Sequence, residues 1–332
     1  ISLRISITGS RRNDNIININ LPNISRKQSF NISEPIVYTE DRDYFKSSFK
    51  VLLRNSFTFS SGFECIVDGK IPINAGTSSS SALIVTWINF LARMSDQSVI
   101  LSPEALSRYA YEAEVLEFSE PGGMMDQYST SFGGIIAIDF FPDTLVTRLD
   151  AKLKTFVLGN SNEPKDTMYI LANVKDRILL IDSKLKNVDP KFSLQNVSLD
   201  ELPKFKNNLS DSEFTLLEGT IKNRDITRIA RTELNKKDID HRFIGALLND
   251  HQKILRDVLG ISTPKIDGMI EAALNAGAYG AKINGSGGGG CMFAYAPEDP
   301  EKVKAAIEDA GGEAFIIISD SGSREEPAEE YK

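Results

Sequence analysis

The chain of 332 residues is long enough for one large hydrophobic core or two smaller ones, and its length favours two domains. Its composition, 41% hydrophobic and 25% charged, is typical of a globular protein. The formal net charge of −8 argues against non-specific binding to nucleic acid or to an anionic membrane surface. If such a protein handles an anion, it needs a local positive site.

The cysteines and the distribution of apolar residues indicate in which cellular compartment the protein is expected. Cys65 and Cys291 lie far apart and form no C-x-x-C pair, so they predict neither a disulfide scaffold nor a zinc site. No run of about 18 apolar residues occurs, and no basic-then-apolar leader precedes Ile1. We therefore expect a cytoplasmic protein without a membrane span, either a monomer or a homodimer.

The first part of the chain is predicted to be rich in β-strands. Residues 3–9 and 15–21 alternate apolar and polar residues around a turn-rich segment, which predicts a hairpin or two neighbouring strands. Two more strands are expected at 49–55 and 62–68. Residues 80–94 have the apolar density of a buried helix.

The rest of the chain mixes helices and strands. Ser102 is the expected N-cap of a helix over 103–117, and the polar stretch 184–213 predicts variable helix and loop. Strands are expected at 135–140, 145–149, 155–158, 281–284, 291–296 and 313–319, and helices at 214–221, 240–259, 265–276 and 300–310. The last elements alternate as in an α+β layer with helices on one face of a sheet.

The segment NAGTSSSSALIV, residues 74–85, is the first candidate site. Small and hydroxylated residues after Pro72 lead into the N-terminus of the expected helix, where unpaired N–H groups can bind a phosphate. The same segment could be a serine-rich N-cap with a flexible lead-in, and the residues alone leave both readings open. No Lys follows Gly76, so the spacing excludes a GxxxxGK[ST] loop.

Two carboxylates form the second candidate. Glu114 lies in the expected helix, and Asp126 follows a Pro-Gly-Gly turn that contains Gly123 and could bring the chain back towards it. One carboxylate could hold a metal and the other could receive a hydroxyl proton. Either could instead be an ordinary solvated or helix-capping acid.

The third candidate is KINGSGGGGCMF, residues 282–293. Five glycines interrupted by Ser286 lose much backbone entropy on folding, which indicates that a ligand needs the bare main chain there. A tight turn would explain only one or two of these glycines.

The remaining polar residues favour phosphoryl transfer. Arg4 stands in the first expected strand and could stabilise transferring charge, although such an arginine can simply be solvated. With only His241 and His251 in the chain, a histidine-based mechanism is not expected. Carboxylates, Mg²⁺ and backbone amides suit phosphoryl transfer, in which the protein mainly positions groups and neutralises charge.

The order of three motifs resembles the GHMP small-molecule kinases, and their sugar-kinase branch in particular. The motifs are LRISITG, PINAGTSSSSAL and KINGSGGGGC, and the stretches GMMDQ and GISTPKID look specifically like galactokinase. The resemblance implies an α+β, two-domain GHMP kinase fold. Residues 1–150 would form a domain of the ribosomal protein S5 domain 2-like type and residues 151–332 a ferredoxin-like domain, with the active site between them.

The resemblance also implies cofactors and residue roles. ATP and Mg²⁺ would be bound, with Ser80 and Glu114 as metal ligands, Asp126 as the catalytic base or partner of the attacking hydroxyl, and Arg4 pairing with Asp126 and the transferring phosphoryl group. The residues expected to contact ATP are Pro72, Asn74, Ala75, Gly76, Thr77, Ser78, Ser79, Ser80, Ser81, Gly285, Ser286, Gly287 and Gly288. The glycine loop, extending to Gly290, would close over the phosphates and the sugar.

The predicted function is transfer of the γ-phosphate of ATP to a sugar hydroxyl, most simply the anomeric one. Residues expected to contact the sugar are Ser10, Arg11, Asn13, Asp14, Gly123 and Asp126. Galactokinases carry G-E-H-T-D-Y-N where this chain reads GSRRNDN, a difference that argues against galactose itself. The open alternatives are a heptose-phosphate or acidic-sugar kinase, a mevalonate-type kinase, and a non-catalytic sensor of sugar and ATP.

Overall fold

The chain forms two compact units, each with its own sheet. The computed structural model describes residues 1–73, 76–120, 122–140, 142–164 and 167–326. The first unit contains Ile1–Ile73, Ser78–Arg148 and the described residues from Ser319 onward, and the second contains Gly76, Thr77 and Leu149–Ile318. The expected domains, 1–150 and 151–332, differ from these units mainly in the C-terminal segment, which belongs with the first unit.

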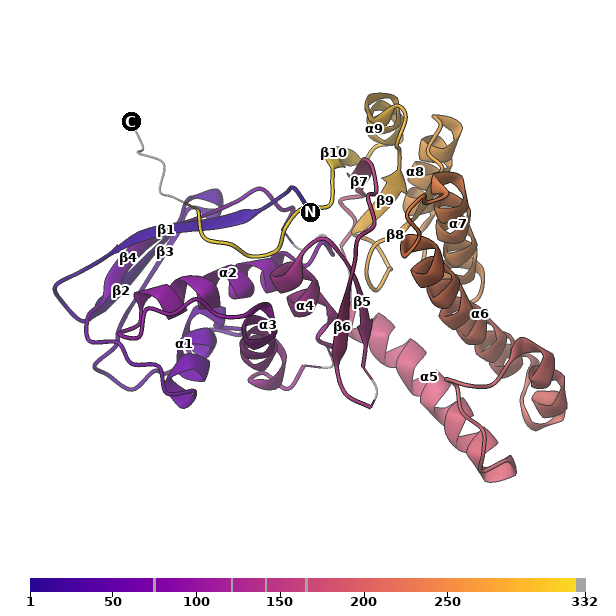
Figure 1. Cartoon of the computed structure of the whole chain (residues 1–332), viewed down its shortest axis with the longest axis horizontal. Coiled ribbons are helices and arrows are strands. Elements are labelled where there is room, and N and C mark those ends of the chain that lie inside the picture. The colour runs from indigo at the N-terminus through magenta and orange to yellow at the C-terminus, as the bar shows by residue number, and fades with distance from the viewer. Residues whose placement is uncertain (74–75, 121, 141, 165–166, 327–332) are drawn as a thin grey trace. The chain divides into compact units, whose positions relative to one another are not determined.

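A four-stranded sheet of order β1-β4-β2-β3 forms one layer of the first unit (Figure 1). Its strands are β1 (Ile5–Arg11), β2 (Ile16–Leu21), β3 (Arg26–Asn31) and β4 (Phe63–Gly69). The predicted pairing of 3–9 with 15–21 is wrong, because β4 lies between them, antiparallel to β1 and parallel to β2. Alternation predicts a strand but not its partner, and β2 instead forms a hairpin with β3.

The strand predicted at 49–55 is also wrong, because these residues belong to the helix α1 (Tyr44–Arg54). Phe45, Phe49 and Leu52 are all buried and recur at helical spacing. A short apolar run fits a buried strand or a buried helix equally well, and here the helical period decides.

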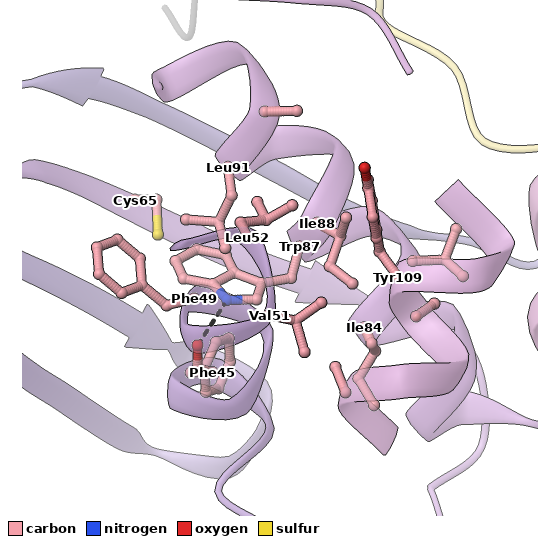
Figure 2. Close-up of a cluster of buried hydrophobic side chains, with 14 of the residues drawn as sticks. Phe45, Phe49, Val51, Leu52, Cys65, Ile84, Trp87, Ile88, Leu91 and Tyr109 are labelled. Atoms are coloured by element: carbon pink, nitrogen blue, oxygen red, sulfur yellow. Dashed lines mark hydrogen bonds between the residues drawn. The ribbon is translucent and has the colours of Figure 1, made fainter. Parts of the chain in front are cut away.

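Helices of the first unit cover one face of this sheet (Figure 1). They are α1, α2 (Ser79–Met94), α3 (Pro103–Tyr111), a π-helical turn (Glu112–Leu116) and α4 (Met125–Phe132). Figure 2 shows the centre of their core, where the indole nitrogen of Trp87 donates to the carbonyl oxygen of Phe45 at 3.0 Å. The helix predicted at 80–94 and the N-cap Ser102 are confirmed, the latter by its side chain accepting from the amide of Ala105.

A short two-stranded sheet completes the first unit. Its strands are β5 (Ile135–Asp139) and β6 (Leu145–Leu149), as predicted to within one residue. β5 follows directly on α4 and the two glycines Gly133 and Gly134.

The second unit has a four-stranded sheet of order β10-β7-β9-β8, with antiparallel pairing throughout the described residues. Its strands are β7 (Phe156–Asn160), β8 (Gly280–Ile283), β9 (Cys291–Tyr295) and β10 (Glu313–Ile317). Its helices are α5 (Thr167–Val188), a 3-10 helix (Leu199–Asn208), α6 (Asp211–Leu234), α7 (His241–Asp257), α8 (Pro264–Asn275) and α9 (Pro300–Asp309). Helices α8 and α9 pack with the sheet in one core, which gives the expected ferredoxin-like β-α-β-β-α-β arrangement.

Two helices of this unit depart from the prediction. α6 covers 24 residues where only 214–221 were expected, because its polar C-terminal half carries little apolar periodicity. α5 was not predicted at all. In the described part of the chain, no helix combines the length and apolarity that crossing a membrane requires.

Candidate active site

The N-terminus of α2 is built in a way that leaves amide groups available. Ser78, the N-cap residue, has left-handed backbone angles (φ 55°, ψ 37°), a strained conformation for a residue other than glycine. Among the described residues no side chain caps this end of the helix, and the first turn contains no acidic residue. Because the first amides of a helix have no intrahelical partner, this end can receive an anion.

The structure divides the predicted phosphate loop between the two units. Pro72 precedes α2 in the first unit, together with Ser78–Ser81, while Gly76 and Thr77 are assigned to the second. Asn74 and Ala75 lie outside the described residues.

Glu114 is buried beside the start of α2, with 7% of its surface exposed. Its Oε2 accepts a hydrogen bond from Nε2 of Gln127 at 2.6 Å, and the hydroxyls of Ser80 and Ser81 also bond to its carboxyl group. Burial raises the pKa of Glu114, the nearby charge of Asp126 raises it further, and these three hydrogen bonds oppose the rise. The predicted metal ligands Ser80 and Glu114 are therefore brought together.

A π-helical turn presents this carboxylate. After α3 the chain continues through Glu112–Leu116, where the amide of Glu117 donates to the carbonyl of Glu112 at 2.9 Å. Ala113, Glu114 and Val115 are all buried in this wider turn. Such turns are frequent at functional sites, and the sequence had predicted an uninterrupted helix in its place.

Asp126 lies in the first turn of α4, one residue before Gln127. Its charge raises the pKa of Glu114, so the two predicted carboxylates lie within electrostatic range of each other. At Gly123, three residues before Asp126 in the sequence, a Cβ atom would meet no described atom within 4 Å. The sequence analysis missed Gln127, although its place directly after Asp126 was the available signal.

The donor set of this site fits Mg²⁺ bound together with a phosphate ligand. Glu114 and Ser80 supply oxygen atoms, and Oε1 of Gln127 is buried with no partner in the described part of the chain. The described residues contain no group of three or more His, Cys, Asp or Glu able to hold a metal by themselves. Mg²⁺ commonly takes one or two carboxylates and completes its shell with phosphates and water, which suits this arrangement.

Arg4 is engaged by the C-terminal segment of the chain. Its Nη2 lies 2.6 Å from Oδ2 of Asp320 and donates to the carbonyl of Ser321 at 2.7 Å. The guanidinium holds the pKa of Asp320 below its usual range. The expected pairing of Arg4 with Asp126 is not among the contacts that Arg4 makes with the described residues.

The turn predicted to bind the sugar lies far from Glu114. Nη2 of Arg11 donates to the carbonyl of Ser95, which follows the C-terminal end of α2. Since α2 has 16 residues and a helix rises about 1.5 Å per residue, this end is about 24 Å from the end that carries Ser80. The structure thus does not bring Ser10, Arg11, Asn13 and Asp14 together with the predicted metal ligands.

The glycine loop of the second unit joins β8 to β9 and packs on its own chain. A Cβ atom on Gly287 would lie 2.3 Å from the carbonyl oxygen of Ile261, and one on Gly289 would lie 2.7 Å from that of Pro164. The amide of Gly288 donates to the same Ile261 carbonyl at 2.7 Å. Internal packing therefore accounts for part of the bare backbone that the sequence assigned to a ligand.

Two side chains in or beside the glycine loop, those of Ser286 and Asn284, have polar groups that bear on the predicted phosphate contacts. Oγ of Ser286 is buried and has no partner among the described residues. Nδ2 of Asn284 donates to the carbonyl of Gly76 at 2.7 Å, a contact within the second unit. Gly285, like Gly287 and Gly288, has a positive φ that favours glycine.

Two family models match the chain. The family model "GHMP kinases N terminal domain" matches residues 43–134, and "GHMP kinases C terminal" matches residues 230–313. Together the two matches cover more than half of the chain.

Individual relatives fall into two groups. The chain is 29% identical to mevalonate kinase of Thermococcus sibiricus over 264 residues, covering 79% of this chain and 69% of the relative. It is 28% identical to galactokinase of Homo sapiens over 266 residues, covering 78% of this chain and 66% of the relative. The structure of Lactococcus lactis galactokinase complexed with galactose superposes with a TM-score of 0.79 at 19% identity, over 97% of this chain and 87% of that one, which shows the shared fold.

Proposed function

Because the chain belongs to the GHMP kinase family, we propose that it transfers the γ-phosphate of ATP to the anomeric hydroxyl of a sugar. As a member of this family it is an ATP-dependent small-molecule kinase with an alcohol group as acceptor. The proposal concerns the substrate and the residues that act on it.

One observation carries the proposed mechanism: the buried carboxylate of Glu114 bonds to the hydroxyls of Ser80 and Ser81 at the start of α2, where no described side chain caps the helix. Asp126 lies close enough for its charge to act on Glu114. The amides and hydroxyls of Ser78–Ser81 would hold phosphate oxygens, and Ser80 and Glu114 would hold Mg²⁺. When bound, the metal neutralises phosphate charge that builds up during transfer. Ser286 is a further candidate for a phosphate contact, because its hydroxyl lacks a partner.

Asp126 is proposed to act on the attacking hydroxyl. It stands in the first turn of α4, three residues after Gly123, where a Cβ would meet no described atom, and its carboxylate would accept a proton from a sugar hydroxyl. Phosphoryl transfer needs little covalent help from the protein, so positioning the nucleophile is the main contribution of such a residue.

Arg4 and the turn from Gly9 to Asn15 are left out of this mechanism. Arg4 uses its Nε and Nη2 groups on Asp320 and Ser321, which favours a structural role. The turn lies at the opposite end of α2 from the proposed metal ligands.

A sugar substrate is supported by two stretches of sequence and by one group of relatives. GMMDQ and GISTPKID look like galactokinase, and human galactokinase is among the similar proteins. A second candidate, mevalonate, is supported by the Thermococcus sibiricus relative, whose identity is marginally higher.

A substrate panel separates these candidates. Purified protein would be given ATP and Mg²⁺ with hexoses, pentoses, uronic acids, amino sugars, heptose phosphates and mevalonate, and ADP release would be followed by a coupled assay. Turnover of a sugar, with the phosphate located at the anomeric carbon by NMR, is the expected result. Turnover of mevalonate alone would replace the sugar proposal by the second candidate, and no turnover of any compound would refute both.

A further inference from the structure

Gln127 is the polar residue whose surroundings the proposed mechanism leaves unexplained. It lies on α4 with only 2% of its surface exposed. Its Nε2 donates to Oε2 of Glu114 at 2.6 Å and lies 3.5 Å from Oγ of Ser81. Its Oε1 is buried and finds no donor among the described residues.

The orientation of this amide follows from the carboxylate beside it. Rotating the amide by half a turn would place Oε1 against the Glu114 carboxylate, and two acceptors would then face each other. Nε2 therefore points to Glu114, and Oε1 must point elsewhere. Buried acceptors in native proteins are normally satisfied, so this oxygen calls for a donor from water or a ligand.

The hydrogen bonds around Glu114 indicate that Gln127 helps to hold its carboxylate in place. Ser80, Ser81 and Gln127 all bond to this carboxylate, but Ser80 is itself a proposed metal ligand. If the Ser80 hydroxyl turns its oxygen to the metal, Ser81 and Gln127 remain to fix the carboxylate. Removing a group that holds a ligating carboxylate typically lowers metal affinity about 10- to 100-fold.

We propose that Gln127 is a positioning residue of the metal site, whose amide nitrogen holds the Glu114 carboxylate and whose amide oxygen accepts a hydrogen bond from water bound to Mg²⁺. Mg²⁺ usually keeps several of its waters in proteins, and each of these is a hydrogen-bond donor. This inference rests on the proposed function and adds a residue to its metal site.

The test measures metal binding directly. Mn²⁺ would replace Mg²⁺, a non-hydrolysable ATP analogue would be present, and electron paramagnetic resonance would report the free Mn²⁺. Gln127→Met keeps the length and removes both polar atoms, and we expect its Kd for Mn²⁺ to rise about 10- to 100-fold. Binding of the analogue without metal should stay within twofold of the wild-type value.

Ser131→Ala is the matched control. Ser131 is buried one turn further along α4, and its Oγ also lacks a partner among the described residues. We expect this variant to bind Mn²⁺ within about twofold of wild type, since its hydroxyl is not bonded to Glu114. A loss equal to that of Gln127→Met would show a general effect of α4 and overturn the proposal.

A second variant covers the case in which Gln127→Met does not fold. Gln127→Asn keeps the amide but withdraws it by one methylene, so contact with Glu114 should be lost and Mn²⁺ binding weakened. Wild-type affinity in either folded variant refutes the role of Gln127. If the wild-type protein itself binds no Mn²⁺ with the ATP analogue, the proposed function fails, which is a separate result.

Discussion

The start of α2 and the glycine loop are both predicted to contact phosphates, yet they are built in opposite ways. At α2, the described residues leave the helix end uncapped and the amide oxygen of Gln127 without a partner, and a carboxylate is buried. In the glycine loop, amides of Gly288 and Gly290 are already bonded to carbonyls of their own unit. The first region keeps its polar groups available, whereas the second already bonds two of its amides within its own unit and leaves the hydroxyl of Ser286 without a partner among the described residues.

This difference indicates a division of labour. Buried polar groups without partners destabilise a fold, so those that touch a buried carboxylate are candidates for contact with a ligand. Glycines pressed against backbone, such as Gly287 on Ile261, are retained for shape. We therefore expect substitutions at the α2 site to reduce activity more than stability, and substitutions in the loop to do the reverse.

Asp126→Asn should give the largest loss of activity. Removing a group that receives a proton typically lowers kcat about 10²- to 10⁴-fold, and Asn keeps the size of the side chain. Calorimetry with the ATP analogue should show affinity within about twofold of wild type, since Asp126 is not assigned to phosphate binding. Full activity in this variant would remove Asp126 from the mechanism.

Glu114→Gln should lower activity and yet preserve or increase stability at neutral pH. Folding raises the pKa of Glu114 above its ordinary value of 4.5, so the folded state favours the protonated form. The free energy of unfolding of the wild-type protein therefore falls as pH rises through the raised pKa, and the neutral Gln escapes this loss. Well below pH 4.5 the Glu114 carboxyl is protonated in the folded and in the unfolded state, so the pH-dependent difference between the two proteins should be smallest there.

Thermal unfolding of the two proteins between pH 4 and pH 8 measures this effect. The melting temperature of Glu114→Gln minus that of wild type should increase with pH. A difference that decreases with pH would mean that the hydrogen bonds from Ser80, Ser81 and Gln127 outweigh burial, and would contradict the direction of the pKa shift.

The helices and strands that were predicted correctly are those marked by the pattern of apolar and capping residues within a short stretch of sequence. The apolar density of 80–94 and the Ser102 cap were sufficient to place α2 and the start of α3. Strand partners were not predictable, because β1 pairs with β4 more than fifty residues away. The same limit applies to Arg4, whose partner Asp320 is separated from it by 316 positions.

In the candidate site too, the features that depend on neighbouring residues could be predicted, and those that depend on distant segments of the chain could not. Glu114 and Asp126 could be proposed from residue type and spacing, whereas the π-helical turn that buries Glu114 leaves no mark in the apolar period. The glycine run was predicted to hold a ligand against its main chain, and the structure shows carbonyl groups of the chain itself against Gly287 and Gly289. Which backbone lies there, that of Ile261 or Pro164, depends on distant segments of the chain.

Gly287→Ala and Gly123→Ala test the division of labour as a pair. Gly287 has φ +80°, and an added Cβ would lie 2.3 Å from the Ile261 carbonyl oxygen, so Ala should destabilise the protein by about 1–3 kcal/mol or more. Gly123 has no atom within 4 Å of an added Cβ, so its Ala variant should melt within a degree or two of wild type.

At a temperature where both variants are folded, Gly123→Ala should be the less active of the two, although it is the more stable one. A methyl group at Gly123, which is predicted to contact the sugar, should raise the KM for the acceptor. If Gly287→Ala is as stable as wild type, internal packing does not explain the loop, and a ligand contact would have to account for its glycines.

Arg11→Ala should have the smallest effect. Its guanidinium donates to the Ser95 carbonyl at the C-terminal end of α2, so its loss should lower stability by about 0.5–1.5 kcal/mol. Because that end of α2 is remote from Ser80 and Glu114, the kcat and the acceptor KM should stay within about twofold of wild type. Arg11→Lys, which keeps a donor, should recover part of the stability. A large rise in the acceptor KM in Arg11→Ala would mean that the turn does contact the sugar, as the sequence had predicted, and that the long distance along α2 does not separate it from the substrate.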